Sequence, residues 1–142
     1  MKILECSSRG DKRFSAFYAK VEVFGKLDSI ENHYQSCKRT VDNRPAKKGQ
    51  KVGQIIFTIP NGPSIRLSPT YLTAYYKLLW CKYLDNNPEL VKYASAYDDY
   101  NDIFKGKAIN CQADVIRQYI KQGRDSILNE PDVVQLRNIL SK

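Results

Sequence analysis

The pattern of apolar and polar positions predicts a helix over residues 28–38 that has two distinct faces. Apolar residues recur there every three or four positions, which is the spacing of one buried helix face. This face consists of Ile30, Tyr34, Cys37 and Val41. Asp28 and Glu31 have the spacing of a capping box, so the helix is expected to begin at Asp28.

A row of polar residues lies beside this apolar face. The row consists of Glu31, Gln35, Lys38 and Asp42. It puts an acid, an amide and an amine at the edge of buried surface, where pKa values can be tuned and a substrate can reach. The spacing alone favours a different interpretation, in which the row is a solvated helix surface.

The rest of the chain predicts a short strand at residues 21–24 and a hairpin of residues 54–59 with 64–67. Residues 98–102 have the composition of a polar loop. Further helices are expected to begin near Ser68, Pro88, Asn110 and Asn129. The helix after Ser68 is expected to bury one apolar face made of Leu72, Tyr76, Leu79 and Tyr83.

These elements predict an α+β, mainly helical fold with a small β-hairpin or sheet. A length of 142 residues suits one domain with a real core, and we see no internal repeat. We therefore expect a single domain over residues 1–142. Its core is expected at about 14–122, and a C-terminal helix at about 131–141.

The composition restricts the cellular setting and the chemistry that we expect. Four cysteines are spread along the chain without metal-ligand spacing, and there is only one histidine. We therefore expect no metal site, no cofactor and no disulfide framework. No apolar run has the length of a membrane span, and residues 1–6 are too polar for a secretory signal. We expect a cytoplasmic protein with no membrane partner.

A net charge of +8 suggests a polyanionic partner such as nucleic acid. Many of the cations lie within one short stretch, residues 38–51, most of which Pro45 and Gly49 make a loop. The candidate nucleic-acid-binding residues are Arg39, Arg44, Lys47, Lys48 and Lys51. A solubilising charged loop is the alternative, but this loop directly follows the predicted helix that carries Glu31.

Four motifs, in order along the chain, resemble those of the NADAR superfamily. Residues 14–18, Phe-Ser-Ala-Phe-Tyr, are similar to the family's F-S-N-F-Y, and residues 31–38 to its E-H-x-x-Q-x-x-K. Residues 82–90 are similar to K-F-x-x-N-P-x-L, and Asp102 through Asn110 to D-x-x-W-G followed by N. The matches span roughly residues 14 to 120. The chain looks most like the divergent branch that accompanies or counters DNA-modifying ADP-ribosyltransferase toxins.

The resemblance implies a mainly helical N-glycosidase that cleaves the bond between ribosyl C1″ and a base nitrogen. In the class that acts on DNA, the lysine that matches Lys38 attacks C1″ and forms a Schiff base. Glu31 is then implied as general acid or base, or as a ligand of a ribose hydroxyl. Asp102 is implied as a proton shuttle or ribose ligand. Positive charge from Arg39 and the basic loop favours the neutral amine that a nucleophile needs.

The substrate-binding residues implied by the resemblance lie in several motifs. Phe17 and Tyr18 are placed to stack on a base, Gln35 orients the sugar, and Asn110 meets a diphosphate. The full set is Arg13, Ser15, Phe17, Tyr18, Gln35, Trp80 and Asn110.

Each of the main candidates also has a purely structural interpretation. Glu31 and Asn110 can serve as helix-cap residues, and Asp102 can cap the turn that follows it. Lys38 can be a surface lysine. A lone tryptophan such as Trp80, on an amphipathic helix, is more often part of the core.

The chain departs from the family pattern at three positions. Ala16 stands where the family has Asn, Asn32 where it has His, and Lys105 where it has Trp. The change at Ala16 removes a polar substrate contact, so the exact substrate stays open.

These observations predict an enzyme that removes ADP-ribose from guanine in DNA, acting in the bacterial cytoplasm and encoded by the host or by a phage. One alternative is an N-glycosidase of a small ribosyl-phosphate metabolite. Another is a non-catalytic module that binds ADP-ribose or DNA.

Overall fold

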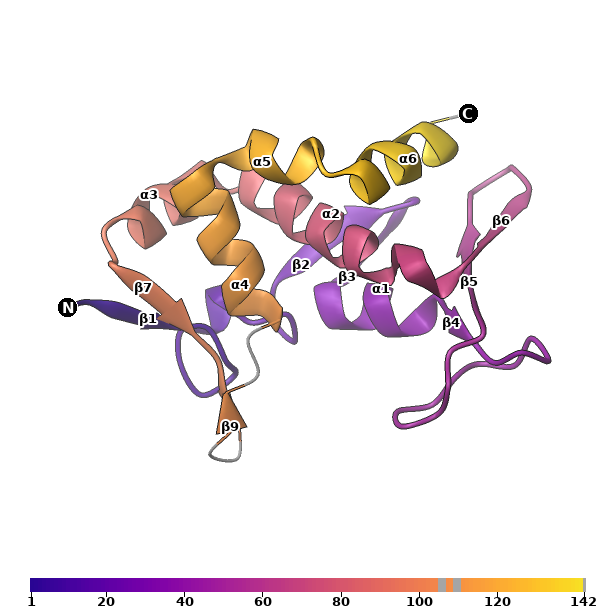
Figure 1. Ribbon diagram of the computed structural model, residues 1–142, viewed down its shortest axis with the longest axis horizontal. Coiled ribbons are helices and arrows are strands. Elements are labelled where there is room, and N and C mark those ends of the chain that lie inside the picture. The colour runs from indigo at the N-terminus through magenta and orange to yellow at the C-terminus, as the bar shows by residue number, and fades with distance from the viewer. Residues whose placement is uncertain (105–106, 109–110, 142) are drawn as a thin grey trace.

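Helix α2 (Leu72–Asp85) runs through the middle of the molecule, with other elements on both sides of it (Figure 1). The computed structural model describes residues 1–104, 107–108 and 111–141. Helix α1 (Ile30–Ser36) packs on one side of α2 and α6 (Pro131–Leu140) on the other. The described residues form an α+β fold that is mainly helical, as the sequence predicts.

The buried residues of α2 surround the helix instead of forming a single stripe. They are Ala74, Tyr75, Leu79, Trp80, Cys81, Tyr83 and Leu84. The expected apolar face does pack on the core, with Leu79 and Tyr83 buried and Leu72 and Tyr76 partly buried, but burial extends to the other sides of the helix as well. A helix that is buried on nearly every side is a central core element.

The other helices follow their expected starts with local differences. A 3₁₀ turn (Pro69–Tyr71), capped by Ser68, precedes α2, and α3 (Pro88–Ser95) follows it. Helix α4 (Cys111–Arg117) continues into a π-helical turn (Gln118–Gln122). Gly123, at φ 95°, ends that turn, and the unexpected short helix α5 (Arg124–Leu128) follows. A further 3₁₀ turn lies at Lys12–Phe14.

Strands pair in small separate sheets. The predicted hairpin is confirmed: β5 (Gln54–Thr58) and β6 (Ser64–Leu67) are antiparallel, and β4 (Lys38–Arg39) adds to β5. The predicted first strand is β2 (Lys20–Val23), which pairs with β3 (Lys26–Ser29). A short antiparallel pair joins β8 (Ile103–Phe104) to β9 (Lys107–Ala108).

Strand β1 (Ile3–Glu5) runs parallel to β7 (Asp99–Asn101), with Leu4 opposite Tyr100. The polar loop predicted at residues 98–102 is therefore partly a strand. The reason is burial: Tyr100 is fully buried and its hydroxyl donates to the carbonyl of Ala94 at 2.6 Å.

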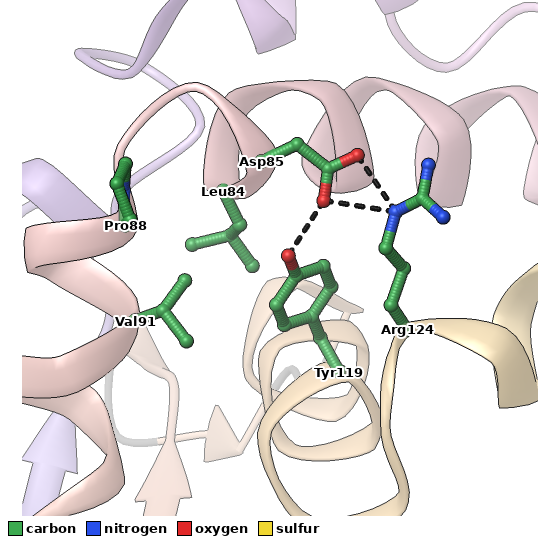
Figure 2. A pocket seen from close by; sticks show the side chains of 6 residues that line it. All are labelled: Leu84, Asp85, Pro88, Val91, Tyr119 and Arg124. Atoms are coloured by element: carbon green, nitrogen blue, oxygen red, sulfur yellow. Dashed lines mark hydrogen bonds and ion pairs between the residues drawn. The ribbon is translucent and has the colours of Figure 1, made fainter.

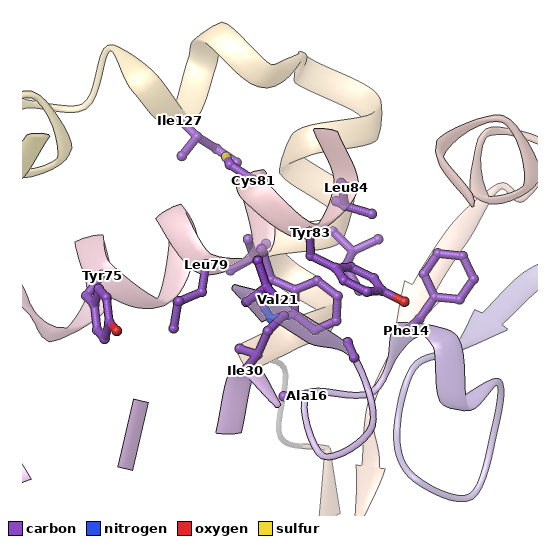
Figure 3. Packing of buried hydrophobic residues seen from close by; sticks show 14 of the residues in the cluster. Phe14, Ala16, Val21, Ile30, Tyr75, Leu79, Cys81, Tyr83, Leu84 and Ile127 are labelled. Carbon is purple, nitrogen blue, oxygen red and sulfur yellow. The ribbon is translucent and has the colours of Figure 1, made fainter. Parts of the chain in front are cut away.

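Large apolar side chains from the two halves of the chain meet around α2 (Figure 3). Phe14, Ile30 and Trp80 are completely buried there, and Trp80 meets Tyr83 edge-on with 5.5 Å between ring centroids. Complete burial of one such side chain stabilises a fold by roughly 1.5–3 kcal/mol. The core therefore fixes the N-terminal segment and α1 against α2.

Helix α1 is shorter than predicted at both ends. Its N-cap is Ser29, whose hydroxyl accepts from the Asn32 amide at 3.1 Å. Asp28 belongs to β3 and accepts from the Asn32 side chain at 2.9 Å, so the predicted capping box is wrong. The helix ends at Ser36, because the chain then pairs with β5, and Val41 is 79% exposed instead of buried.

Within the described part of the chain, no helix has both the length and the apolar character needed to cross a bilayer.

Candidate active site

The segment that carries Phe17 and Tyr18 is tied to the first turn of α1. The amide of Glu31 donates to the carbonyl of Ala16 at 2.9 Å, and the amide of Ile30 donates to Ala19 at 2.9 Å. Phe17 and Tyr18 are 58% and 50% exposed. Both rings therefore reach the surface beside the start of α1, and Lys12 Nζ lies 4.9 Å from the centre of the Tyr18 ring. The family resemblance implies that a base stacks here.

Ser15 plays a structural part in the same segment. It is fully buried, and its hydroxyl accepts from the amide of Phe17 at 3.4 Å. Its carbonyl accepts from the amides of Tyr18 and Ala19 at 3.0 and 2.8 Å. These bonds hold the turn that presents the two exposed rings.

Asp102 is a buried carboxylate at the start of α4. It is 3% exposed, and its two oxygens accept from the Gln112 side chain at 2.9 Å and from the Ala113 amide at 2.8 Å. Burial raises the pKa of Asp102, although both hydrogen bonds oppose that rise. The bond to Ala113 satisfies an amide in the first turn of α4, so Asp102 does cap the helix that follows it.

Gln112 connects Asp102 to the segment beside α1. While its amide nitrogen donates to Asp102, its Oε1 accepts from the amide of Ala16 at 2.7 Å. The carbonyl of Ala16 also accepts from the backbone amide of Glu31, so Gln112 and Ala16 together connect Asp102 to the start of α1. The sequence did not predict a role for Gln112, because Gln112 and Ala16 are 96 positions apart and no local sequence pattern indicates their contact.

Lys38 lies just outside α1 but still beside the predicted polar row. Its Nζ is 3.4 Å from Oε1 of Gln35 and 4.2 Å from the centre of the Tyr34 ring. The Nζ therefore lies in a cation–π position over the ring. Gln35 in turn donates to the carbonyl of Ala46 at 2.9 Å, so Lys38 and the following loop share one anchor.

Asp42 does not belong to this row, contrary to the expectation from helical spacing. The helix ends before it, and its carboxylate accepts from the hydroxyl of Thr40 at 2.5 Å and pairs with Arg44 at 2.7 Å. Only Glu31, Gln35 and Lys38 of the predicted row remain next to one another along α1 and its end.

The thiol of Cys37, next to Lys38, is a poor nucleophile. Cys37 is buried, which raises the pKa of its thiol to about 12. A thiol with so high a pKa is protonated at neutral pH and unreactive. Cys37 is therefore a structural core residue and not a candidate nucleophile.

The basic loop between β4 and β5 extends from the body of the molecule near the end of α1 (Figure 1). Its exposed cations are Arg44, Lys47, Lys48 and Lys51. The loop is fixed at its middle by Ala46, which is 5% exposed and whose amide donates to the carbonyl of Lys38 at 3.1 Å. The middle of the loop is therefore attached to the backbone of Lys38.

Arg66 is a further cation of this surface that the sequence prediction did not include. Its Nη1 donates to Asn43 at 3.0 Å and to Gln54 at 2.8 Å, which docks the basic loop on β6. The alternation of Ile65, Arg66 and Leu67 along β6 could have predicted this position, because neighbouring residues of a strand point to opposite faces and Arg66 therefore points away from the two apolar side chains.

Two predicted substrate-binding residues contact side chains other than Lys38 in the described structure. Trp80 is fully buried in the core, so its predicted role in substrate binding is wrong and its interpretation as a core residue is confirmed. Arg13 pairs with Asp11 at 2.7 Å and lies over the ring of Tyr93 at 4.4 Å. Asn110 lies outside the described residues.

One hollow of about 450 Å³ lies between α2, α3 and the segment after α4 (Figure 2). Its wall consists of Leu84, Asp85, Pro88, Val91, Tyr119 and Arg124. Asp85 accepts from Arg124 Nε at 2.8 Å and from the Tyr119 hydroxyl at 2.6 Å, so its charge is already compensated. None of the predicted site residues lines this hollow.

A second hollow of about 420 Å³ lies between the β2–β3 turn, α1 and the β5 strand. Its wall contains Arg39, but not Lys38, Glu31 or Asp102. The guanidinium of Arg39 donates to the carbonyls of Ser36 at 2.8 Å and Lys38 at 3.1 Å, which caps the end of α1. Among the residues that the structure describes, no cluster of His, Cys, Asp or Glu side chains could hold a metal ion.

No protein-family model matches the chain, and no curated protein matches its sequence. The family interpretation therefore rests on the four motifs and on the arrangement of the residues within them.

Proposed function

We propose that this protein is an N-glycosidase that removes ADP-ribose from guanine bases in DNA. The observation that carries the proposal is the position of Lys38, whose amine lies 3.4 Å from Gln35 at the foot of the basic loop. An amine beside a phosphate-attracting surface is suited to attack the sugar of a nucleic-acid adduct.

In the proposed reaction the neutral amine of Lys38 attacks C1″ of the ribose. The bond between C1″ and the base nitrogen breaks, and the base leaves with a proton supplied by a general acid. The ribose ring opens to give a Schiff base on Nζ. Water then adds to C1″, releasing ADP-ribose and the free lysine.

The proposed proton donor is a carboxyl group. Asp102 has its pKa raised by burial, which favours the protonated form that an acid catalyst needs. Glu31 lies in the first turn of α1, at the other end of the hydrogen bonds that run from Asp102 through Gln112 and Ala16. It is the alternative proton donor, or a ligand of a ribose hydroxyl. Exposed Phe17 and Tyr18 beside Glu31 provide surfaces on which a base can stack.

The proposed partner is DNA because of where the positive charge lies. The net charge is +8, and the loop that carries the exposed cations is attached to Lys38 and Gln35 through Ala46. Phosphate contacts of this kind supply most of the affinity of proteins for nucleic acid. We further propose that the enzyme counters a DNA ADP-ribosyltransferase toxin in the bacterial cytoplasm, encoded by the host or by a phage.

The test is incubation with an oligonucleotide that carries ADP-ribosylated guanine, followed by mass analysis. We expect loss of the ADP-ribose mass and recovery of unmodified guanine, with a thymine-linked oligonucleotide unchanged. An unchanged guanine adduct would contradict the proposal. Release of a base from a small ribosyl phosphate would then identify a metabolite enzyme, and tight binding without turnover would identify a non-catalytic binding module.

A further inference from the structure

The two residues of strand β4, Lys38 and Arg39, lie in different surroundings on opposite sides of the strand. Successive side chains of a strand point to opposite sides. Lys38 accordingly lies over Tyr34 and beside Gln35, whereas the next residue, Arg39, lines the hollow between the β2–β3 turn, α1 and β5. The two sides are one residue apart along the chain.

That hollow combines cations and aromatic surface. Arg39 and Lys26 bring positive charge to its wall, and Ser36 and Thr58 bring hydroxyl groups. Lys26 is 71% exposed and lies 3.5 Å from Asp28, and the bonds of Arg39 described above use only Nη1 of its guanidinium. Both cations therefore retain donors for an anion.

The aromatic side chain of Phe24 in the wall belongs to a hairpin turn whose backbone conformation is unfavourable for a bulky residue. Phe24 and Gly25 connect β2 to β3 with φ values of 53° and 79°, the signature of a type I′ hairpin turn. Asn and Gly favour the first position of that turn, whereas a bulky residue is disfavoured there. Phe24 nevertheless holds it, and its ring lines the hollow while resting 5.8 Å from the ring of Phe57.

We propose that this hollow binds one nucleotide of a single DNA strand. Its base stacks on Phe24, and its phosphate meets Arg39 and Lys26. Cationic side chains that follow the backbone, interleaved with aromatic rings, are the usual way in which proteins hold single strands. The inference rests on the proposed function only in taking DNA as the partner and requires no chemistry at Lys38.

The deciding variant is Phe24→Asn, measured by fluorescence anisotropy with an unmodified, labelled thymidine oligonucleotide. Asn followed by Gly25 is the preferred sequence for a type I′ turn, so the hairpin is retained while the stacking ring is lost. We expect affinity to fall roughly tenfold with little change in its salt dependence. The matched control is Leu27→Asn, on the same hairpin at a residue that is 66% exposed and outside the wall, and it should bind like the wild type.

Arg39→Gln tests the phosphate contact separately. Loss of one contact to a single strand should lower the slope of log affinity against log salt by about 0.7. Wild-type affinity in a thermally stable Phe24→Asn protein would overturn the inference while leaving DNA as the partner. Equal losses in Phe24→Asn and Leu27→Asn would also overturn it.

Two further results would place the ligand elsewhere. No binding of the oligonucleotide by the wild type would overturn both this inference and the choice of DNA, while turnover of a small ribosyl phosphate would still be measurable. Displacement of the oligonucleotide by free deoxythymidine monophosphate, dependent on Phe24, would mean that the hollow takes free nucleotides and not a strand.

Discussion

The amine of Lys38 lies 3.4 Å from Oε1 of Gln35, although Lys38 has already left the helix that carries Gln35. The same glutamine donates to Ala46 in the middle of the basic loop. One side chain thus fixes both the proposed nucleophile and the loop that is proposed to hold DNA. The strand pairing of Lys38 with Ile55 keeps this corner in place.

Gln112→Ala should destabilise the fold by about 1–3 kcal/mol, because buried polar groups would lose their partner. The amide of Ala16, a residue that is 2% exposed, and one oxygen of Asp102 both depend on Gln112. Urea denaturation measures the change. The control is Gln122→Ala at an exposed position, which should stay within about 0.5 kcal/mol of the wild type. Equal stability of the two variants would contradict the proposed link.

Asp102 should give stability an unusual dependence on pH. Its pKa in the folded protein is raised by burial, so the folded state binds this proton more tightly than the unfolded chain, where aspartate has a pKa of about 3.9. Its contribution to stability is complete below that value and is lost as pH rises through the folded pKa. The wild type should therefore lose stability relative to Asp102→Asn as pH rises above about 4. A relative gain over that interval, measured by chemical denaturation, would contradict the raised pKa.

Trp80 should matter for stability and not for substrate binding. Its ring is fully buried, and its indole nitrogen has no hydrogen-bond partner in the structure. Trp80→Ala should cost about 3–5 kcal/mol. Trp80→Phe keeps a ring in the core and removes the unpaired donor, so it should retain wild-type KM. A large rise in KM for Trp80→Phe, with stability preserved, would restore a direct role in binding.

The basic loop should control DNA affinity through charge. Replacing Lys47, Lys48 and Lys51 by alanine removes three exposed cations. If each contacts one phosphate of a single strand, the salt slope of binding should fall by about 2. Turnover at saturating substrate should change little, since Lys38 and Gln35 are untouched. An unchanged salt slope would favour a small metabolite as the substrate.

Features fixed by local sequence were the ones that could be predicted. The hairpin of β5 and β6 follows from the turn residues between two β-branched runs, and α6 begins at the predicted Pro131. The parallel pairing of Leu4 with Tyr100 was missed because it joins distant segments whose residues include few strand formers. The sequence pattern placed Lys38 in the helix because helical periodicity contains no information about its strand partner, Ile55.

The candidate site was predictable to the same extent. Gln35 and Lys38 were expected to be neighbours, and they are. The family motifs singled out Asp102 but not the reason for its burial, which lies in its bonds to Gln112 and Ala113. Phe24 was not singled out for binding, because its left-handed backbone conformation follows from the register of β2 and β3 and not from its own preference.

Reductive trapping tests the central claim most directly. The protein is incubated with the oligonucleotide bearing ADP-ribosylated guanine in the presence of sodium borohydride, and the product is mapped by peptide mass analysis. The account predicts a stable adduct of reduced ADP-ribose on Lys38, no adduct and no turnover with Lys38→Ala, and an unaffected adduct with Lys92→Ala, an exposed lysine of α3 outside the proposed site. Turnover by Lys38→Ala at near the wild-type rate, or an adduct on another residue, would contradict the role of Lys38.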